Sequence, residues 1–224
     1  MSRIAAYGIW ESPISAQTVA AQGLRLGFVA LDGDDIYWLE GRPHEGGRNA
    51  LVRRGADGRI EDVVPRDHNV RTRVHEYGGG AYVVADGVIY YSNFSDQRIY
   101  RRHCGTSLKG LSHSVAEPIT PEGAWFYADA TIDASRNRLI CVREDHSKPG
   151  QEALTTLVSI PANPESRNPN PGEILTYGSD FYSTPRLSPD GATLSWLSWR
   201  HPQMPWDGTE LWIADVTSTG ALAN

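Results

Sequence analysis

Two short runs of this sequence hold the residue types best suited to chemistry. The first run contains Arg73, His75, Glu76 and Tyr77, and the second is Glu144, Asp145 and His146. Adjacent carboxylates could bind the α-amino group of a substrate through charge-assisted hydrogen bonds, as an aminopeptidase requires. Neither run requires a ligand. The polar residues of the first run could instead hydrogen-bond to the turn that enters the next strand, and the second run could be a solvated loop. Both runs are therefore candidate substrate-gating or interface residues.

A serine nucleophile of the α/β-hydrolase type needs a Gly-x-Ser-x-Gly turn between a strand and a helix. The sequence contains no such turn. Its nearest run is Tyr177-Gly178-Ser179-Asp180, which lacks the intervening residue and the second glycine. A triad assembled from distant Ser, His and Asp residues stays open, because triads are recognised by geometry. We expect no catalytic residue here and no peptidase activity from this chain alone.

Metal and cofactor sites have equally little support. The seven histidines are scattered without the spacing of metal ligands. No helix is predicted after Gly78-Gly79-Gly80, so these glycines lack the helix N-terminus that a phosphate site uses. Cys104 and Cys141 form no metal-type pair and are expected to be reduced thiols. We predict no metal and no cofactor.

The charge balance limits the partners. There are 21 basic and 27 acidic residues, which gives a net charge of −6. A mildly acidic chain without a basic block is a poor binder of nucleic acid or of an anionic membrane. No apolar run approaches the roughly 20 residues of a membrane span, and the first residues lack the apolar core of a secretory signal. We expect a cytoplasmic protein with no nucleic-acid or membrane partner.

A repeat of about fifty residues organises the chain. Four apolar runs resemble one another and start at residues 36, 88, 139 and 194, namely Ile36–Leu39, Val88–Tyr91, Leu139–Val142 and Leu194–Leu197. Each follows a turn signal and an earlier strand-like run. The clearest turn is Ala85-Asp86-Gly87-Val88, because Asp-Gly tolerates the two positive φ angles of a type I′ hairpin.

Further strands complete each repeat. A third strand is predicted in every unit, at Ala50–Arg53, Arg98–Arg101, Thr156–Ile160 and Glu210–Ala214. A fourth is predicted in the first three units, at Ile60–Val64, Ala116–Ile119 and Glu173–Thr176. Four strands in about fifty residues are typical of a β-propeller blade. A β-sandwich is the alternative, but its strands need not recur in groups of four.

The sequence therefore predicts an all-β protein, a partial β-propeller of about four four-stranded blades. Residues 1–27 form a short N-terminal segment with one helix near residues 15–22, where Ser15 is the N-cap and Gly23 ends the helix. Residues 28–224 form the propeller, with blades at about 28–65, 81–120, 126–177 and 181–224.

Several runs are more specific than the repeat. They are Tyr7–Ile14, Arg71–Tyr82 with its His-Glu-Tyr-Gly-Gly-Gly core, Ser92–Tyr100, Val142–His146, Asp180–Gly191 and His201–Asp207. With these runs the chain resembles the N-terminal propeller of the prolyl oligopeptidase family of serine peptidases, in the branch similar to dipeptidyl-aminopeptidases and acylaminoacyl-peptidases. The resemblance covers essentially all 224 residues.

The resemblance implies a propeller that precedes an α/β-hydrolase domain and admits peptides to its site. Since this chain ends at Asn224, before any such domain, we expect a truncated, non-catalytic segment that gates peptide substrates and docks the catalytic domain. The alternative is a free-standing or self-associating propeller module that binds a peptide or protein partner. Open blade edges favour association, so the isolated chain is expected to self-associate or to be marginally stable.

Overall fold

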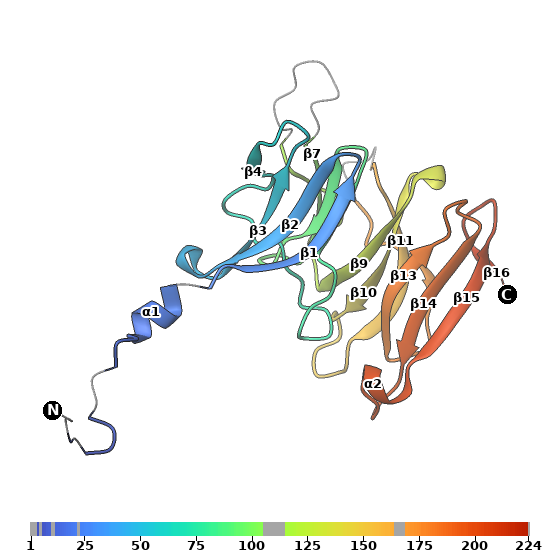
Figure 1. Cartoon of the computed structure of the whole chain (residues 1–224). Coiled ribbons are helices and arrows are strands. Elements are labelled where there is room, and N and C mark those ends of the chain that lie inside the picture. The colour runs from blue at the N-terminus through green and yellow to red at the C-terminus, as the bar shows by residue number, and fades with distance from the viewer. Residues whose placement is uncertain are drawn as a thin grey trace.

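Four antiparallel sheets, each of four strands connected in chain order, make up the body of the molecule (Figure 1). The computed structural model describes residues 4, 6–9, 12–21, 23–104, 115–163 and 169–223. The sheets stand side by side in chain order, from the blue first sheet to the red last one. The predicted all-β fold, a partial propeller of four blades, is confirmed.

The strand bounds follow the fifty-residue repeat. Blade 1 contains β1 (Arg25–Asp32), β2 (Asp35–Arg42), β3 (Arg48–Arg54) and β4 (Ile60–Asp62). Blade 2 contains β5 (Tyr82–Ala85), β6 (Val88–Ser92), β7 (Ile99–His103) and β8 (Glu117–Pro118). Blade 3 contains β9 (Trp125–Asp133), β10 (Arg138–Asp145), β11 (Leu154–Pro161) and β12 (Glu173–Thr176). Blade 4 contains β13 (Phe181–Leu187), β14 (Thr193–Trp199), β15 (Glu210–Val216) and β16 (Leu222–Ala223).

One strand and one α-helix were not predicted. Strand β16 is only two residues long and has no apolar pattern of its own, so it forms through pairing with the end of β15. Helix α2 (Pro205–Gly208) is a single turn. Its signals are a proline at the first helical position and Asp207, whose carboxylate accepts the Met204 N–H at 3.2 Å.

Helix α1 (Ala16–Ala21) extends from the propeller on its N-terminal side (Figure 1). The Ser15 hydroxyl accepts the Thr18 N–H at 2.9 Å, which is the hydrogen bond of an N-cap. Two 3₁₀ turns, η1 (Pro43–Glu45) and η2 (Ala134–Arg136), lie between strands. Within the part of the chain that the structure describes, no helix has both the length and the apolar character needed to cross a bilayer.

The blades are held together by apolar clusters between neighbouring sheets. Successive residues of a strand face opposite sides, so Tyr91 packs toward blade 1 whereas Tyr90 packs toward blade 3. In the same way Leu139 of β10 faces blade 2 and Ile140 faces blade 4. Strands of the middle blades are thus buried on both sides, which explains their unbroken apolar runs.

Both cysteines contribute to these clusters as free thiols. Cys104 lies in the cluster between blades 1 and 2, and Cys141 lies in the cluster between blades 2 and 3. Burial raises the pKa of the Cys104 thiol to about 12. The prediction of two reduced thiols is confirmed, and their role is packing.

Three of the first strands carry the same irregularity. A register shift interrupts β1, β9 and β13, and each shift contains one residue with a positive φ angle: Phe28 (53°), Asp129 (54°) and Thr184 (52°). A β-bulge bends and twists the strand that carries it. The bulge in β9 also directs the Asp129 carboxylate to both neighbouring blades, since it accepts the Gly80 N–H at 2.5 Å and the Thr184 N–H at 3.1 Å.

Candidate functional site

The predicted site residues lie on one face of the propeller. The four strands of each sheet are antiparallel and follow one another in chain order. The first strand of every blade therefore starts, and the second strand ends, on the same face of the propeller. We call it the turn face, formed by residues 43–47, 93–98, 146–153 and 200–209 together with the segment 71–80. It is the lower side in Figure 1, where α2 lies. The first and second candidate runs both reach this face.

An aromatic cluster surrounds His75 on the turn face. The His75 ring lies 5.3 Å from the ring of Trp199, 5.6 Å from that of Phe181 and 5.6 Å from that of Tyr77, measured between centroids. Phe181 and Trp199 stack on each other at 5.2 Å, and His201 meets the edge of Phe181. The fold thus brings a loop before blade 2 onto the end of blade 4, although these residues are more than 100 positions apart.

Glu144 joins the two candidate runs. Its Oε1 accepts the backbone N–H of His75 at 2.7 Å, and its Oε2 lies 3.0 Å from His146 Nε2. His146 also packs against the Phe126 ring, at 4.2 Å between centroids. Since both oxygens of this buried carboxylate are engaged, Glu144 fastens the entrance of blade 2 to blade 3.

Asp145 does not share that environment. It is the next residue of β10 and therefore points to the opposite side of the strand. Its Oδ1 accepts the Ser147 N–H at 2.9 Å in the following turn. The two carboxylates of the second run accordingly do not converge on one point, and that geometry gives no support to joint binding of an ammonium group.

The remaining residues of the first run shape the loop. The Arg73 N–H donates to Gln97 Oε1 at 2.8 Å, and its guanidinium lies 4.5 Å above the Phe94 ring. His75 and Glu76 both have positive φ angles, 57° and 64°, which non-glycine residues seldom adopt. The bond from His75 to Glu144 holds this conformation, and the side chain of Glu76 is exposed.

Burial lowers the pKa of His75, and the charges of Glu144 and Asp129 oppose that shift without cancelling it. The Nε2 atom of His75 is buried and has no hydrogen-bond partner in the described structure. A neutral imidazole is the form that this setting favours. His75 is therefore an uncharged member of the cluster at neutral pH.

Acidification is expected to destabilise the protein through His75. Its folded pKa lies below the ordinary 6.5, so the unfolded state takes up the proton first. The stability that the neutral His75 side chain contributes is complete above pH 6.5 and is lost as the pH falls toward the pKa of His75 in the folded state. In thermal unfolding followed by circular dichroism, His75→Phe should flatten the decline of Tm in that range. The control His44→Gln, at an exposed histidine, should leave the slope unchanged; an unchanged slope in His75→Phe would contradict the prediction.

A cavity of about 660 Å³ adjoins the aromatic cluster. It lies between the lower end of blade 1 and the residues that lead into blade 2, and Tyr77 lines it while contacting His75. Gly41 is also part of the lining, and a Cβ there would lie 3.3 Å from Asn49 Oδ1 and 3.4 Å from the Arg25 Cβ, so a larger residue would crowd both side chains. Its charged lining residues are Arg25, Arg42 and Arg71, and its described lining contains no Asp or Glu.

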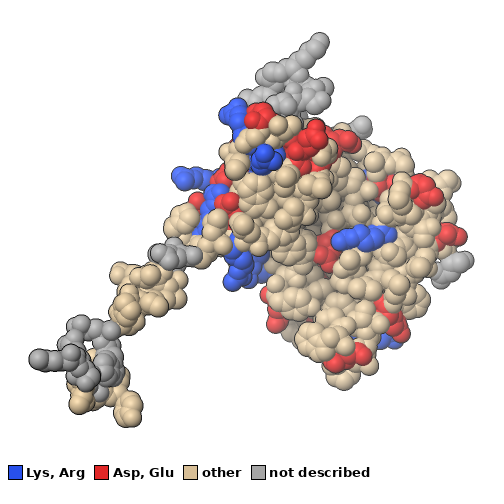
Figure 2. Space-filling model, in the orientation of Figure 1, with Lys and Arg blue, Asp and Glu red and all other residues tan. Residues whose placement is uncertain are grey.

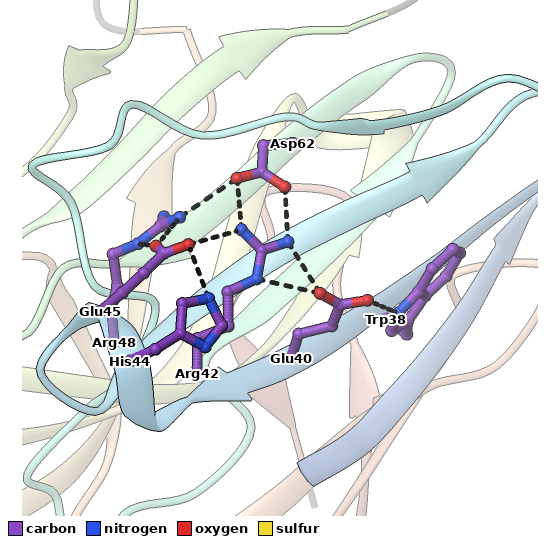
Figure 3. A network of polar contacts seen from close by, with 7 residues as sticks. All are labelled: Trp38, Glu40, Arg42, His44, Glu45, Arg48 and Asp62. Carbon is purple, nitrogen blue, oxygen red and sulfur yellow. Dashed lines mark hydrogen bonds and ion pairs between the residues drawn. The ribbon is translucent and has the colours of Figure 1, made fainter. Parts of the chain in front are cut away.

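Arg42 is already neutralised by an ion-pair network (Figure 3). Its guanidinium donates two hydrogen bonds of 2.7 Å to Asp62 and further bonds of 2.7 and 2.9 Å to Glu40. Glu45 bridges Arg42 to Arg48, at 3.2 and 2.6 Å. On the side shown in Figure 2, most of the Lys and Arg surface lies at the end of the molecule that blade 1 occupies. Because Asp62 and Glu40 neutralise Arg42 and occupy its hydrogen-bond donors, Arg42 is poorly suited to bind an anionic ligand.

Arg25 and Arg71 have no such partners. Neither guanidinium forms a hydrogen bond or ion pair with the described residues, although the Arg71 guanidinium lies 4.8 Å above the Phe94 ring. The sequence places Arg71 in one of the specific runs but does not predict the cavity, because nothing in the spacing relates Arg71 to Arg25. Among the described residues, no three His, Cys, Asp or Glu side chains are grouped so that they could hold a metal ion.

Comparisons with known proteins agree with the fold. Neither the family models nor the curated proteins give a match. Among solved structures, a puromycin hydrolase is 35% identical over 98% of this chain, with a TM-score of 0.86. A puromycin-hydrolyzing peptidase from Mycobacterium tuberculosis is 35% identical over 97%, with a TM-score of 0.81. A prolyl endopeptidase structure, 12% identical over 88% of this chain and with a TM-score of 0.56, shares the fold. The chain spans 34% of the length of the puromycin hydrolase and of the M. tuberculosis peptidase, and 29% of that of the prolyl endopeptidase.

Proposed function

We propose, because this chain corresponds to the N-terminal propeller region of prolyl oligopeptidase-family peptidases, that it is the non-catalytic segment that gates substrates and docks the catalytic domain. The observation that carries the proposal is the 35% identity to puromycin hydrolase over 98% of the chain. The substrates are proposed to be short peptides and aminoacyl amides of the puromycin type. The nucleophile is supplied by an α/β-hydrolase domain outside these 224 residues.

The turn face supports the gating role. It combines the aromatic cluster around His75 with the open cavity beside Tyr77, and a peptide could contact both. Apolar and aromatic walls with a few polar groups are typical of ligand sites. A cytoplasmic location is part of the proposal, since two buried free thiols fit a reducing compartment; fractionation of the native protein checks it.

A fluorophosphonate probe, which labels activated serines, tests this proposal. The product of the complete gene is expected to be labelled, to hydrolyse puromycin and to spare folded proteins, whereas this chain alone stays unlabelled. Labelling of this chain that is abolished by one Ser→Ala substitution would overturn the non-catalytic assignment. A complete product that is neither labelled nor active on puromycin and short peptides would overturn the peptidase assignment.

Self-association is the second candidate role, and the outer faces of the end blades favour it. On blade 4, Leu211 and Ile213 are 67% and 64% exposed and lie on the face turned away from blade 3. On blade 1, Leu31 and Ile60 are 69% and 64% exposed and face away from blade 2. Apolar faces of this kind are covered by a neighbouring blade inside a propeller. A second copy could cover them when no further blade does.

The isolated chain is expected to associate through these faces. The double substitution Leu211→Glu with Ile213→Glu should shift the chain toward monomer, because it places charge on the surface that must be buried. Sedimentation velocity measures the change. Trp206→Glu is the control, since Trp206 is 76% exposed on α2 and lies outside the blade face. A parent chain that is monomeric at every concentration would refute the self-association role.

A further inference from the structure

We infer that the cavity between blade 1 and the segment 70–81 binds the free C-terminal carboxylate of a short peptide, held by Arg25 and Arg71. The inference rests on the proposed function, because it names the part of a peptide that the gate recognises. Three features of the cavity carry it: its charge, its shape and its contrast with the rest of the surface.

The charge of the lining favours an anion. Arg25 and Arg71 both line the cavity, and its described lining contains no Asp or Glu. The third cation, Arg42, is neutralised by Asp62 and Glu40, as described above. Two like charges around one concave space repel each other until an anion enters between them. Guanidinium groups bind carboxylates through paired hydrogen bonds, so a carboxylate suits both the charge and the donor geometry.

The shape of the lining favours a peptide over a small inorganic anion. The walls combine apolar side chains, Leu39, Val70 and Phe28, with the Asn49 side chain and the Tyr77 ring. A volume of about 660 Å³ is within the range of about 300–1,000 Å³ for small-ligand sites. It exceeds what a phosphate ion fills. A C-terminal residue would place its carboxylate on the arginines, its side chain on the apolar wall and its amide near Asn49.

The cationic lining contrasts with the rest of the protein. The chain carries a net charge of −6, and a second cavity of about 460 Å³ at the opposite end of blade 1 is lined by five acidic residues beside two arginines. There Asp35 is paired with Arg53 at 2.7 Å, and Asp32 accepts the Gly87 N–H at 2.7 Å. These acids of blade 1 therefore lie at the end of the blade opposite to Arg25 and Arg71.

Binding of one labelled peptide in two forms tests the inference. The probe is a short apolar peptide with an N-terminal dye, made once with a free C-terminal carboxylate and once as the C-terminal amide. Fluorescence anisotropy is measured on the 224-residue chain at fixed ionic strength. The carboxylate form is expected to bind at least about tenfold more tightly, since a hydrogen bond to a charged group contributes about 1.5–3 kcal/mol. Equal affinities would overturn the inference.

Matched variants locate the effect. Arg25→Gln and Arg71→Gln should each abolish most of the difference between the two peptides, and Arg25→Lys and Arg71→Lys should retain part of it. Arg54→Gln is the control. It removes the same charge, but Arg54 is exposed at the other end of β3, away from the cavity. An equal loss in Arg54→Gln would overturn the inference in favour of a general charge effect.

Two further readouts separate the remaining explanations. Inorganic phosphate that displaces the peptide at equal concentration would overturn carboxylate recognition in favour of a simple anion site. Circular dichroism shows whether each variant is folded, and the lysine variants keep the test decisive if a glutamine variant is not. None of these readouts involves hydrolysis. Peptide binding can therefore be observed even if the peptidase proposal fails, and binding can fail even if the complete product is an active peptidase.

Discussion

Replacing Asp133 by alanine is expected to lower the free energy of unfolding by about 3–5 kcal/mol, the usual effect of breaking a buried ion pair from one side. The Asp133 side chain is fully buried, and its Oδ2 accepts Arg138 Nε at 2.8 Å. Arg136 Nη1 lies 3.1 Å from the same oxygen and 3.1 Å from the carbonyl of Gly191, which belongs to blade 4. The substitution therefore leaves Arg138 uncompensated and loosens the contact between blades 3 and 4.

Urea unfolding of the purified chain measures this effect. Asp215→Ala is the matched control, because Asp215 is an exposed acid on β15, and it should change the free energy of unfolding by less than about 0.5 kcal/mol. A loss of less than about 1 kcal/mol in Asp133→Ala would show that the network adds no net stability.

The pH dependence of the Asp133 variant has a defined sign. Burial raises the pKa of Asp133, but hydrogen bonds from Arg138, Ser135 and Arg136 outweigh burial and hold it below the ordinary 3.8. The stabilisation is complete above the unfolded pKa and is lost as the pH falls through the lower folded value. The difference between parent and Asp133→Ala should therefore shrink only in strong acid.

Replacing Asp129 by alanine is the second change with a large expected effect, about 2–4 kcal/mol, because two hydrogen bonds to a charged group are lost. Asp129 Oδ1 accepts the Gly80 N–H and Oδ2 accepts the Thr184 N–H, so one carboxylate ties blade 3 to both neighbours. The backbone N–H of Asp129 donates in return to the Gly80 carbonyl at 2.8 Å.

Two substitutions at the same position separate the hydrogen bonds from the backbone strain. Asp129→Asn keeps one acceptor and should recover part of the loss. Asp129→Gly removes both acceptors but relieves the positive φ of 54°, so it should be less damaging than alanine. In thermal unfolding, Tm is expected to fall in the order parent, Asp129→Asn, Asp129→Gly, Asp129→Ala. Glycine at parental stability would mean that strain, and not the carboxylate, dominates at this bulge.

The blades themselves could be read from the sequence. Turn residues with the right chemistry precede apolar runs at regular spacing, and Asp86 and Gly87 have the positive φ angles, 52° and 72°, that the type I′ prediction requires. The repeat is local, since each blade is built from strands that are neighbours in the chain. Strand pairing within one blade does not depend on the neighbouring blade, and for this reason the bounds of most strands could be predicted.

The site depended on the packing of different blades. His75 packs against Trp199, and Arg25 and Arg71 line one cavity, which no spacing in the sequence encodes. Glu144 and Asp145 are adjacent in sequence, yet strand alternation sends them to opposite sides. The sequence alone determined that the chain is a row of propeller blades without a hydrolase nucleophile motif. Only the tertiary structure decided which side chains meet, because that depends on how the blades stack and where the bulges turn their strands.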